Sequence, residues 1–154
     1  MQLENKLTLT GRIDRIDASP DGRALIIDYK NSAPDRIKAL VKAHLEGRRI
    51  QGGVYMLALR QAGREVAGML FAGLRGKTAW DGWSTLTAKP CAPEELAAVM
   101  ASARQAALDA VAKIREGVIE PKPADPRLCQ YCSFYDACRF ESAAKVGAGG
   151  EAEE

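Results

Sequence analysis

The sequence GRIDRID at residues 11–17, the turn letters SPDG at 19–22 and the mostly apolar RALIIDYK at 23–30 decide the fold. Together they predict a β-hairpin whose first strand extends from Leu3 to Asp17. A hairpin that pivots near Asp21 pairs residues whose numbers sum to about 42, so Asp14 is expected to face Asp28 across the two strands. Directly opposed like charges destabilise a sheet, and the pattern therefore indicates a shared proton or a bound cation.

Lys30 lies two residues beyond Asp28 and is expected to project from the same face of the strand. Two acids and one amine thus converge. Oxygen ligands of this kind suit Mg²⁺ or Mn²⁺, and a nearby ammonium can stabilise negative charge on a phosphate under attack, which is typical of phosphodiester hydrolysis. The alternative is a solvated surface strand on which Arg12 and Arg15 form ordinary salt bridges with the acids. The residues of the hairpin alone do not decide between the two.

Beyond the hairpin, the chain alternates helices and strands, which indicates the α/β class. Helical spacing predicts a helix that begins with Asp35 as N-cap and runs through Leu45, and a second helix over about 49–61. A buried strand at 65–74 and a short strand at 78–87 are expected at the centre of the sheet. A long helix from Pro93 to about Arg115 is expected to cover one sheet face.

The composition bounds the class of protein. The chain has 154 residues, 47% of them hydrophobic, which fits one globular domain. The formal net charge of +2 gives little information about partners, so any nucleic-acid contact must come from local patches. We see no signal peptide and no apolar run long enough to span a bilayer, and we expect a soluble, cytoplasmic protein without a membrane partner. The glycine- and glutamate-rich tail at 145–154 is expected to be disordered.

GRIDRID, then IIDYK at 26–30 and Gln51-x-x-x-Tyr55, resemble the motifs of the PD-(D/E)XK nuclease superfamily, specifically its RecB and AddB branch. The resemblance implies a restriction-endonuclease-like core, with a central mixed sheet flanked by helices, over residues 1–140. It also implies that Asp14 and Asp28 are ligands of Mg²⁺ or Mn²⁺, with the backbone carbonyl of Tyr29 as a third ligand. Lys30 would be the catalytic lysine.

The same resemblance implies that Gln51 and Tyr55 line the catalytic site and contact the DNA backbone. The alternative for Tyr55 is a half-buried core residue on an amphipathic helix. Arg48 and Arg49, with other basic residues of the two central helices, are expected to contact phosphates, although solvated helix faces look similar. The single histidine of the chain, His44, does not match a family position and is expected at the surface or between helices.

The segment 121–140 contains three cysteines within a stretch of ten residues: Cys129, Cys132 and Cys138. Thiolates at such spacing select Zn²⁺ or an iron-sulfur cluster, and both usually take four protein ligands. In AddB-like nucleases such a triplet joins a cysteine far upstream and holds a [4Fe-4S] cluster, whereas Cys91 is expected to be a bystander. Three interpretations stay open: an incomplete cluster site, a cluster or Zn²⁺ completed by Cys91 or another group, or free thiols.

The resemblance therefore implies a metal-dependent DNA exonuclease domain of a RecB/AddB-like recombination and repair enzyme, with DNA as substrate and a helicase domain or partner subunit as partner. Family members carry helices with a further His or Glu before the first motif. This chain begins almost at that motif, so we expect part of the active centre to be absent, and the chain by itself need not be active. The rival functions are a non-catalytic DNA-binding or scaffold module, as a degenerate or truncated nuclease, and a Zn²⁺-stabilised interaction domain.

Overall fold

The computed structural model describes residues 1–4, 6–123, 125–138 and 140. The chain divides into two compact units, Met1–Arg115 and Glu116–Glu154, which are described separately. The predicted disordered tail at 145–154 lies outside the described residues. The prediction of a single nuclease-like domain over residues 1–140 stays a prediction.

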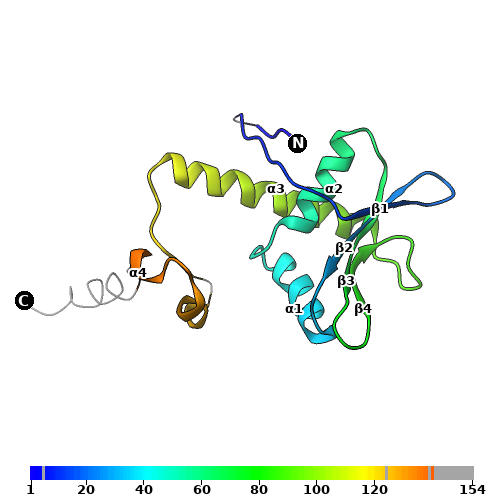
Figure 1. The fold of residues 1–154 in the computed structure, drawn as a ribbon. Coiled ribbons are helices and arrows are strands. Elements are labelled where there is room, and N and C mark those ends of the chain that lie inside the picture. The colour runs from blue at the N-terminus through cyan, green and yellow to red at the C-terminus, as the bar shows by residue number, and fades with distance from the viewer. Residues whose placement is uncertain (5, 124, 139, 141–154) are drawn as a thin grey trace, which may run out of the picture. The chain divides into compact units, whose positions relative to one another are not determined.

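The first unit is built on a four-stranded sheet in the order β1-β2-β3-β4 (Figure 1). The strands are β1 (Arg15–Ala18), β2 (Ala24–Lys30), β3 (Val66–Gly73) and β4 (Ala79–Ser84). β2 pairs with β3 in parallel, and the other two pairs are antiparallel. The predicted hairpin and the mixed sheet are therefore confirmed. The prediction that residues 78–87 lie at the sheet centre is wrong, because β4 pairs with β3 alone and forms an edge.

Three helices pack against one face of this sheet. α1 (Pro34–Leu45) and α2 (Gln51–Gln61) form the crossover that the parallel pair of β2 and β3 requires, and α3 (Pro93–Arg115) follows β4. The buried core joins the inward-facing residues of the strands to the apolar stripes of all three helices. Its largest fully buried side chains are Ile26, Ile37, Met56, Met69 and Phe71. The predicted α/β class is thereby confirmed.

The start of α2 lies unusually close to α3 because residue 53 is a glycine. A Cβ added to Gly53 would lie 2.4 Å from Ala103 Cβ and 2.6 Å from the carbonyl oxygen of Val99. Such distances leave no room for a side chain unless the helices shift. Of the two adjacent glycines that weaken a helix prediction from propensity, Gly53 is therefore explained by packing.

Two predicted boundaries differ from the structure. The first strand begins at Arg15 rather than at Leu3, because the segment before it forms hydrogen bonds within itself and with α2, among them Gln2 N–H to Gln61 Oε1 at 2.9 Å. The N-cap of α1 is Ala33 and not Asp35. Pro34 occupies the first helical position, where its missing N–H is harmless, and Asp35 lies in the first turn, where the helix dipole favours an acid.

The second unit contains two short helices, a 3₁₀ helix at Pro126–Tyr131 and α4 (Tyr135–Cys138). The side chain of Asp125 caps the first of them by accepting the backbone N–H of Arg127 at 3.1 Å. None of the helices in the described part of the chain is both long enough and apolar enough to cross a membrane.

Candidate active site

Asp28 and Lys30 lie at the carboxyl-terminal end of β2. Both project toward the helices, because residues two apart in a strand share a face and Ile26, on that same face, belongs to the core. Gln51 and Tyr55 lie one turn apart at the start of α2. The side chain of Asp28 is buried, with the residue 2% exposed, whereas those of Lys30, Gln51 and Tyr55 are half-buried. The carboxyl-terminal end of β2 thus faces the beginning of α2.

Four of the predicted site residues form one continuous polar network. Lys30 Nζ lies 2.6 Å from Asp28 Oδ2 and donates a hydrogen bond to Gln51 Oε1 at 3.1 Å. The amide of Gln51 donates in turn to Asp28 Oδ1 and to the Tyr55 hydroxyl, both at 3.2 Å. The Tyr55 hydroxyl donates to the backbone carbonyl of Arg12 at 2.7 Å. The network links β2, α2 and the segment that leads into β1.

Asp14, the residue just before β1, also reaches this region. Its Oδ2 atom accepts the backbone N–H of Tyr29 at 3.0 Å, which brings the carboxylate to the peptide that follows Asp28. The register of β1 and β2, with Arg15 opposite Ile27, continues in the direction that puts Asp14 opposite Asp28. Asp14 is exposed, so the two acids differ strongly in burial.

The salt-bridge alternative applies to a different acid of the hairpin. Arg15 pairs with Asp17 at 2.7 Å, and the two side chains are 51% and 39% exposed. Arg15 also donates to the hydroxyl of Tyr29, whose side chain is exposed. The ion pair that the structure gives Asp28 is with Lys30. An ordinary exposed pair therefore accounts for Asp17 but not for the buried carboxylate.

The donor set fits a hard divalent cation. Asp28 Oδ2 is buried and accepts no hydrogen bond within the described residues, although Lys30 Nζ lies close to it as an ion-pair partner. The partner of this buried carboxylate oxygen is thus a cation, which is the kind of partner that a divalent metal ion could replace. The described residues contain no group of three or more His, Cys, Asp or Glu side chains that could hold a metal. Mg²⁺ does not need one, since it usually keeps several waters and takes only one or two carboxylates with phosphate oxygens.

His44 is buried between α1 and α2, so the expectation of a position between helices describes it and that of a surface position does not. Its Nδ1 donates to the carbonyl of Leu40 at 2.9 Å, and its Nε2 accepts the backbone N–H of Gly52 at 3.2 Å. The neutral imidazole thus uses both of its ring nitrogens in hydrogen bonds. Burial lowers the pKa of His44 below its ordinary value. Its spacing from Ile37 and Val41 on the buried stripe of α1 is the signal that could have found it.

The predicted phosphate contacts Arg48 and Arg49 line a cavity of about 480 Å³ together with Lys30 and Gln51. Arg60, in contrast, lies at the far end of α2, where its guanidinium is 3.9 Å from the sulfur of Met100. The basic residues expected around the central helices therefore do not form one cluster.

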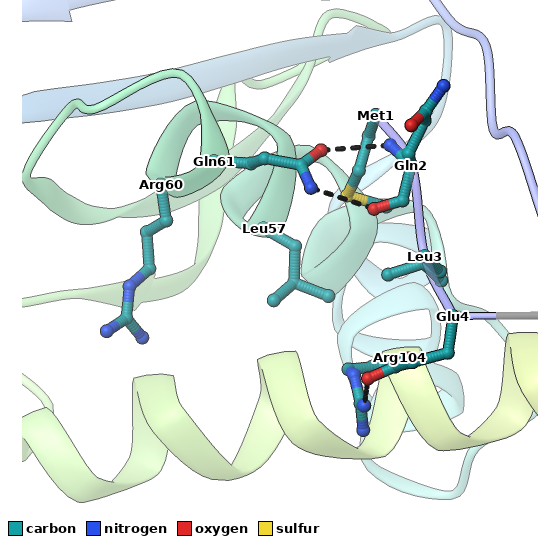
Figure 2. A pocket seen from close by; sticks show the side chains of 8 residues that line it. All are labelled: Met1, Gln2, Leu3, Glu4, Leu57, Arg60, Gln61 and Arg104. Atoms are coloured by element: carbon teal, nitrogen blue, oxygen red, sulfur yellow. Dashed lines mark hydrogen bonds and ion pairs between the residues drawn. The ribbon is translucent and has the colours of Figure 1, made fainter.

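The segment Met1–Glu4 forms a second hollow on the other end of α2 (Figure 2). There Gln2 and Gln61 exchange two hydrogen bonds, and Glu4 forms an ion pair with Arg104 of α3. None of the residues lining this cavity of about 440 Å³ belongs to the predicted site. Its contacts hold the amino-terminal segment against the helices, which fixes the path toward Arg12.

The cysteines are placed differently from the hairpin residues. Cys132 and Cys138 are exposed and Cys129 is partly exposed, and the described residues do not gather them into a metal-binding group. Three thiols are also one fewer than the four ligands that a cluster takes. Cys91 packs against the core of the first unit, and burial raises the pKa of its thiol, which disfavours the thiolate that a metal requires. Cys91 thus has the surroundings expected of a bystander.

Comparison with known proteins gives one match. The family described as the PD-(D/E)XK nuclease superfamily matches residues 1–139. No curated protein and no solved structure matches the chain.

Proposed function

Because the chain belongs to the PD-(D/E)XK nuclease superfamily, we propose that it is a Mg²⁺- or Mn²⁺-dependent deoxyribonuclease whose reaction takes place at Asp28 and Lys30. The single observation that carries this proposal is the network of Asp28, Lys30, Gln51 and Tyr55. Residues from separate motifs meet there through direct contacts. A mixed sheet flanked by helices is also the restriction-endonuclease-like arrangement expected for this family.

The chemistry can be assigned to named groups. Asp28 and Asp14 would hold the divalent ion, with the backbone carbonyl of Tyr29 as a third ligand. When bound, the ion would neutralise charge on the scissile phosphate and lower the pKa of a water molecule. Lys30 brings a positive charge to the same place, where it can orient the attacking water and stabilise the negative charge that develops on the phosphate.

Gln51 and Tyr55 position the lysine and the strand. The amide of Gln51 accepts from Lys30 and donates to Asp28, so it fixes the distance between the two charged groups. Tyr55 is bound to the backbone of Arg12 and to Gln51, which holds its ring beside the segment before β1. A substrate strand that crosses this region would contact both side chains, and Arg48 and Arg49 would contact its phosphates.

The finer proposal is an exonuclease domain of a RecB/AddB-like enzyme of DNA recombination and repair, acting with a helicase domain or a partner subunit. It rests on the spacing of GRIDRID, DYK and Gln51-x-x-x-Tyr55 in the sequence. In the same branch the segment with Cys129, Cys132 and Cys138 would contribute three ligands to a [4Fe-4S] cluster. That part rests on cysteine spacing alone, and no step of the reaction depends on it.

A cleavage assay with linear single-stranded and double-stranded DNA in Mg²⁺ and in Mn²⁺ tests the proposed function. Asp28→Asn keeps the shape of the buried side chain but removes its charge, and we expect cleavage to fall by roughly a thousandfold or more. Asp17→Asn, on the same hairpin but in an exposed salt bridge, is the matched control and should cleave like the wild type.

Two results would contradict the proposal. If Asp28→Asn cleaved DNA as fast as Asp17→Asn does, Asp28 would not belong to the active site. DNA binding by the wild-type chain without cleavage in either metal would instead favour the non-catalytic DNA-binding module. Release of mononucleotides or short fragments from DNA ends, rather than internal cuts, tests the exonuclease assignment.

A further inference from the structure

A basic cavity lies next to the candidate active site and shares two of its residues. The cavity has a volume of about 480 Å³ and extends along α1 to the start of α2. Lys30 and Gln51 form the wall on the side of Asp28, since Lys30 contacts that carboxylate directly. A ligand in the cavity would therefore be a neighbour of any group bound at Asp28.

The charges that face the cavity are of one sign. Besides Lys30, its wall contains three arginines, Arg36 of α1 and Arg48 and Arg49 of the loop before α2. The described residues that line it include no carboxylate. Arg48 is paired with Glu46, whereas Arg36 and Arg49 form no ion pair with any described residue. These two guanidinium groups are exposed, so they can bind an anion without first breaking an internal pair.

Two helices also begin at this cavity. Ser32, just before α1, and Arg36, in its first turn, line one end, and Gln51, the first residue of α2, lines the other. The N-cap residues Ala33 and Ile50 supply no side-chain hydrogen bond to either helix. The amino-terminal end of a helix carries a partial positive charge and N–H groups that favour anions. The helix ends thus add to the field of the four cationic side chains.

We propose that this cavity binds a phosphate group of the substrate strand next to the phosphate that is cleaved, with Arg36 and Arg49 as its main ligands. The inference rests on the proposed function, because that function supplies the polyanionic strand at Asp28. A planar guanidinium group can donate two parallel hydrogen bonds to two oxygens of one phosphate. Ser32 offers a hydroxyl donor on the same wall. Arg36, which belongs to none of the sequence motifs, becomes a substrate-binding residue.

The test measures binding separately from cleavage. A short fluorescent oligothymidylate is titrated with the full chain in EDTA, at several salt concentrations, and fluorescence anisotropy gives the dissociation constant. The double variant Arg36→Ala/Arg49→Ala should bind about tenfold more weakly. Its salt dependence should also be shallower by about 0.7, because each phosphate of a single strand that the protein neutralises contributes about 0.7 to the slope.

Arg64→Ala/Lys113→Ala removes the same total charge from exposed positions outside the cavity and is the matched control, expected to bind within about twofold of the wild type. Circular dichroism and thermal melting of all variants check that the fold is kept. Equal weakening in the two double variants, or in neither, would overturn the proposal.

Oligonucleotides with a 5′-phosphate, with a 3′-phosphate or with hydroxyls at both ends distinguish the source of the phosphate. A terminal phosphate that strengthens binding to the wild type, but not to Arg36→Ala/Arg49→Ala, places the strand end in the cavity. Equal affinity for all three strands, with weaker binding by the double variant, places an internal phosphodiester there. Both results support a phosphate site.

Together with the cleavage assay in Mg²⁺ and in Mn²⁺, this binding experiment separates the phosphate site from the proposed function. A chain that needs Arg36 and Arg49 for binding but does not cleave DNA would contradict the nuclease function and leave the phosphate site standing. A chain that cleaves DNA through Asp28 but binds equally well without these arginines would overturn the phosphate site alone.

Discussion

Two regions of the molecule carry side chains suited to metal chemistry. One is the end of β2 with the start of α2, and the other is the cysteine segment of the second unit. The fold holds the side chains of the two regions in different ways. Asp28 and Gln51 belong to elements that bury much of their length in the core, and their side chains contact each other directly. Cys132 and Cys138 lie in or beside helices of a few residues, and their side chains are exposed.

The difference shows what converts spacing along the chain into a site. A strand fixes which residues share a face, and a packed helix fixes which turn meets that face. Motifs on such elements are brought together by the same packing that stabilises the fold. A short 3₁₀ helix with exposed side chains has no such constraint, and a ligand or a partner must supply it.

The largest effect is expected from changing the packing that holds α2. Gly53→Ala adds a methyl group against Val99 and Ala103, and should lower the free energy of unfolding by about 1–3 kcal/mol, although alanine normally stabilises a helix relative to glycine. Ala103→Gly in the same chain should restore part of the stability. Ser133→Ala, in the cysteine segment, should change it by no more than about 0.5 kcal/mol. Urea unfolding measures all of these variants, and a Gly53→Ala protein as stable as the wild type would show that tight packing does not position Gln51.

Metal binding separates the two regions next. Mn²⁺ should stabilise the wild type by about 2.7 kcal/mol at a metal concentration about one hundred times the dissociation constant, seen as a rise in the melting temperature. Asp28→Asn should lose this rise, whereas the triple variant Cys129→Ser/Cys132→Ser/Cys138→Ser should keep it. The reverse result would place the metal in the cysteine segment and break the comparison.

A smaller effect follows from the buried histidine that supports α2. The pKa of His44 in the folded chain is lower than its ordinary value of 6.5, so the folded state favours the neutral ring. Stability is then fully present above pH 6.5, the ordinary pKa, and falls as the pH drops from there toward the lowered pKa, by about 1.4 kcal/mol for each pH unit between the two. His44→Gln, in a chain with no other histidine, should flatten this part of the pH profile of the melting temperature. An unchanged profile would mean that His44 is not the group responsible.

The smallest effect concerns the cysteine segment and leaves the fold of the first unit unchanged. Iodoacetamide at neutral pH should modify Cys132 and Cys138 rapidly and Cys91 slowly, because Cys91 packs against the core and burial raises the pKa of its thiol. Mass spectrometry of timed samples measures the order. Protection of the whole triplet in anaerobically purified protein, with visible absorbance near about 400 nm, would instead show a cluster that orders this segment.

Much of the first unit could be predicted from the sequence because its signals are local and regular. The turn at 19–22 set the register of the hairpin, and helical spacing located α1, α2 and α3 to within a few residues. The contact between Asp28 and Gln51 was expected only through the family resemblance, because it joins residues of separate elements that no periodicity relates.

Other features depend on packing between elements and left little trace in the sequence. Gly53 is typical of a broken helix until Ala103 is seen against it, and His44 is polar in a stripe of apolar neighbours. The path of the amino-terminal segment depends on contacts such as that of Gln2 with Gln61, 59 residues away. Arg36 gained its significance from the cavity that the fold builds around it.

If Asp28 holds the proposed divalent ion, the contact of Lys30 with Asp28 gives the ammonium group a second task, as a placeholder for that ion. A buried carboxylate without a cation strongly destabilises a fold, and in the ion-free chain Lys30 supplies that cation from 2.6 Å. The protein can therefore fold before it acquires metal. Without the lysine, the buried carboxylate would need another cation or a proton when the chain folds.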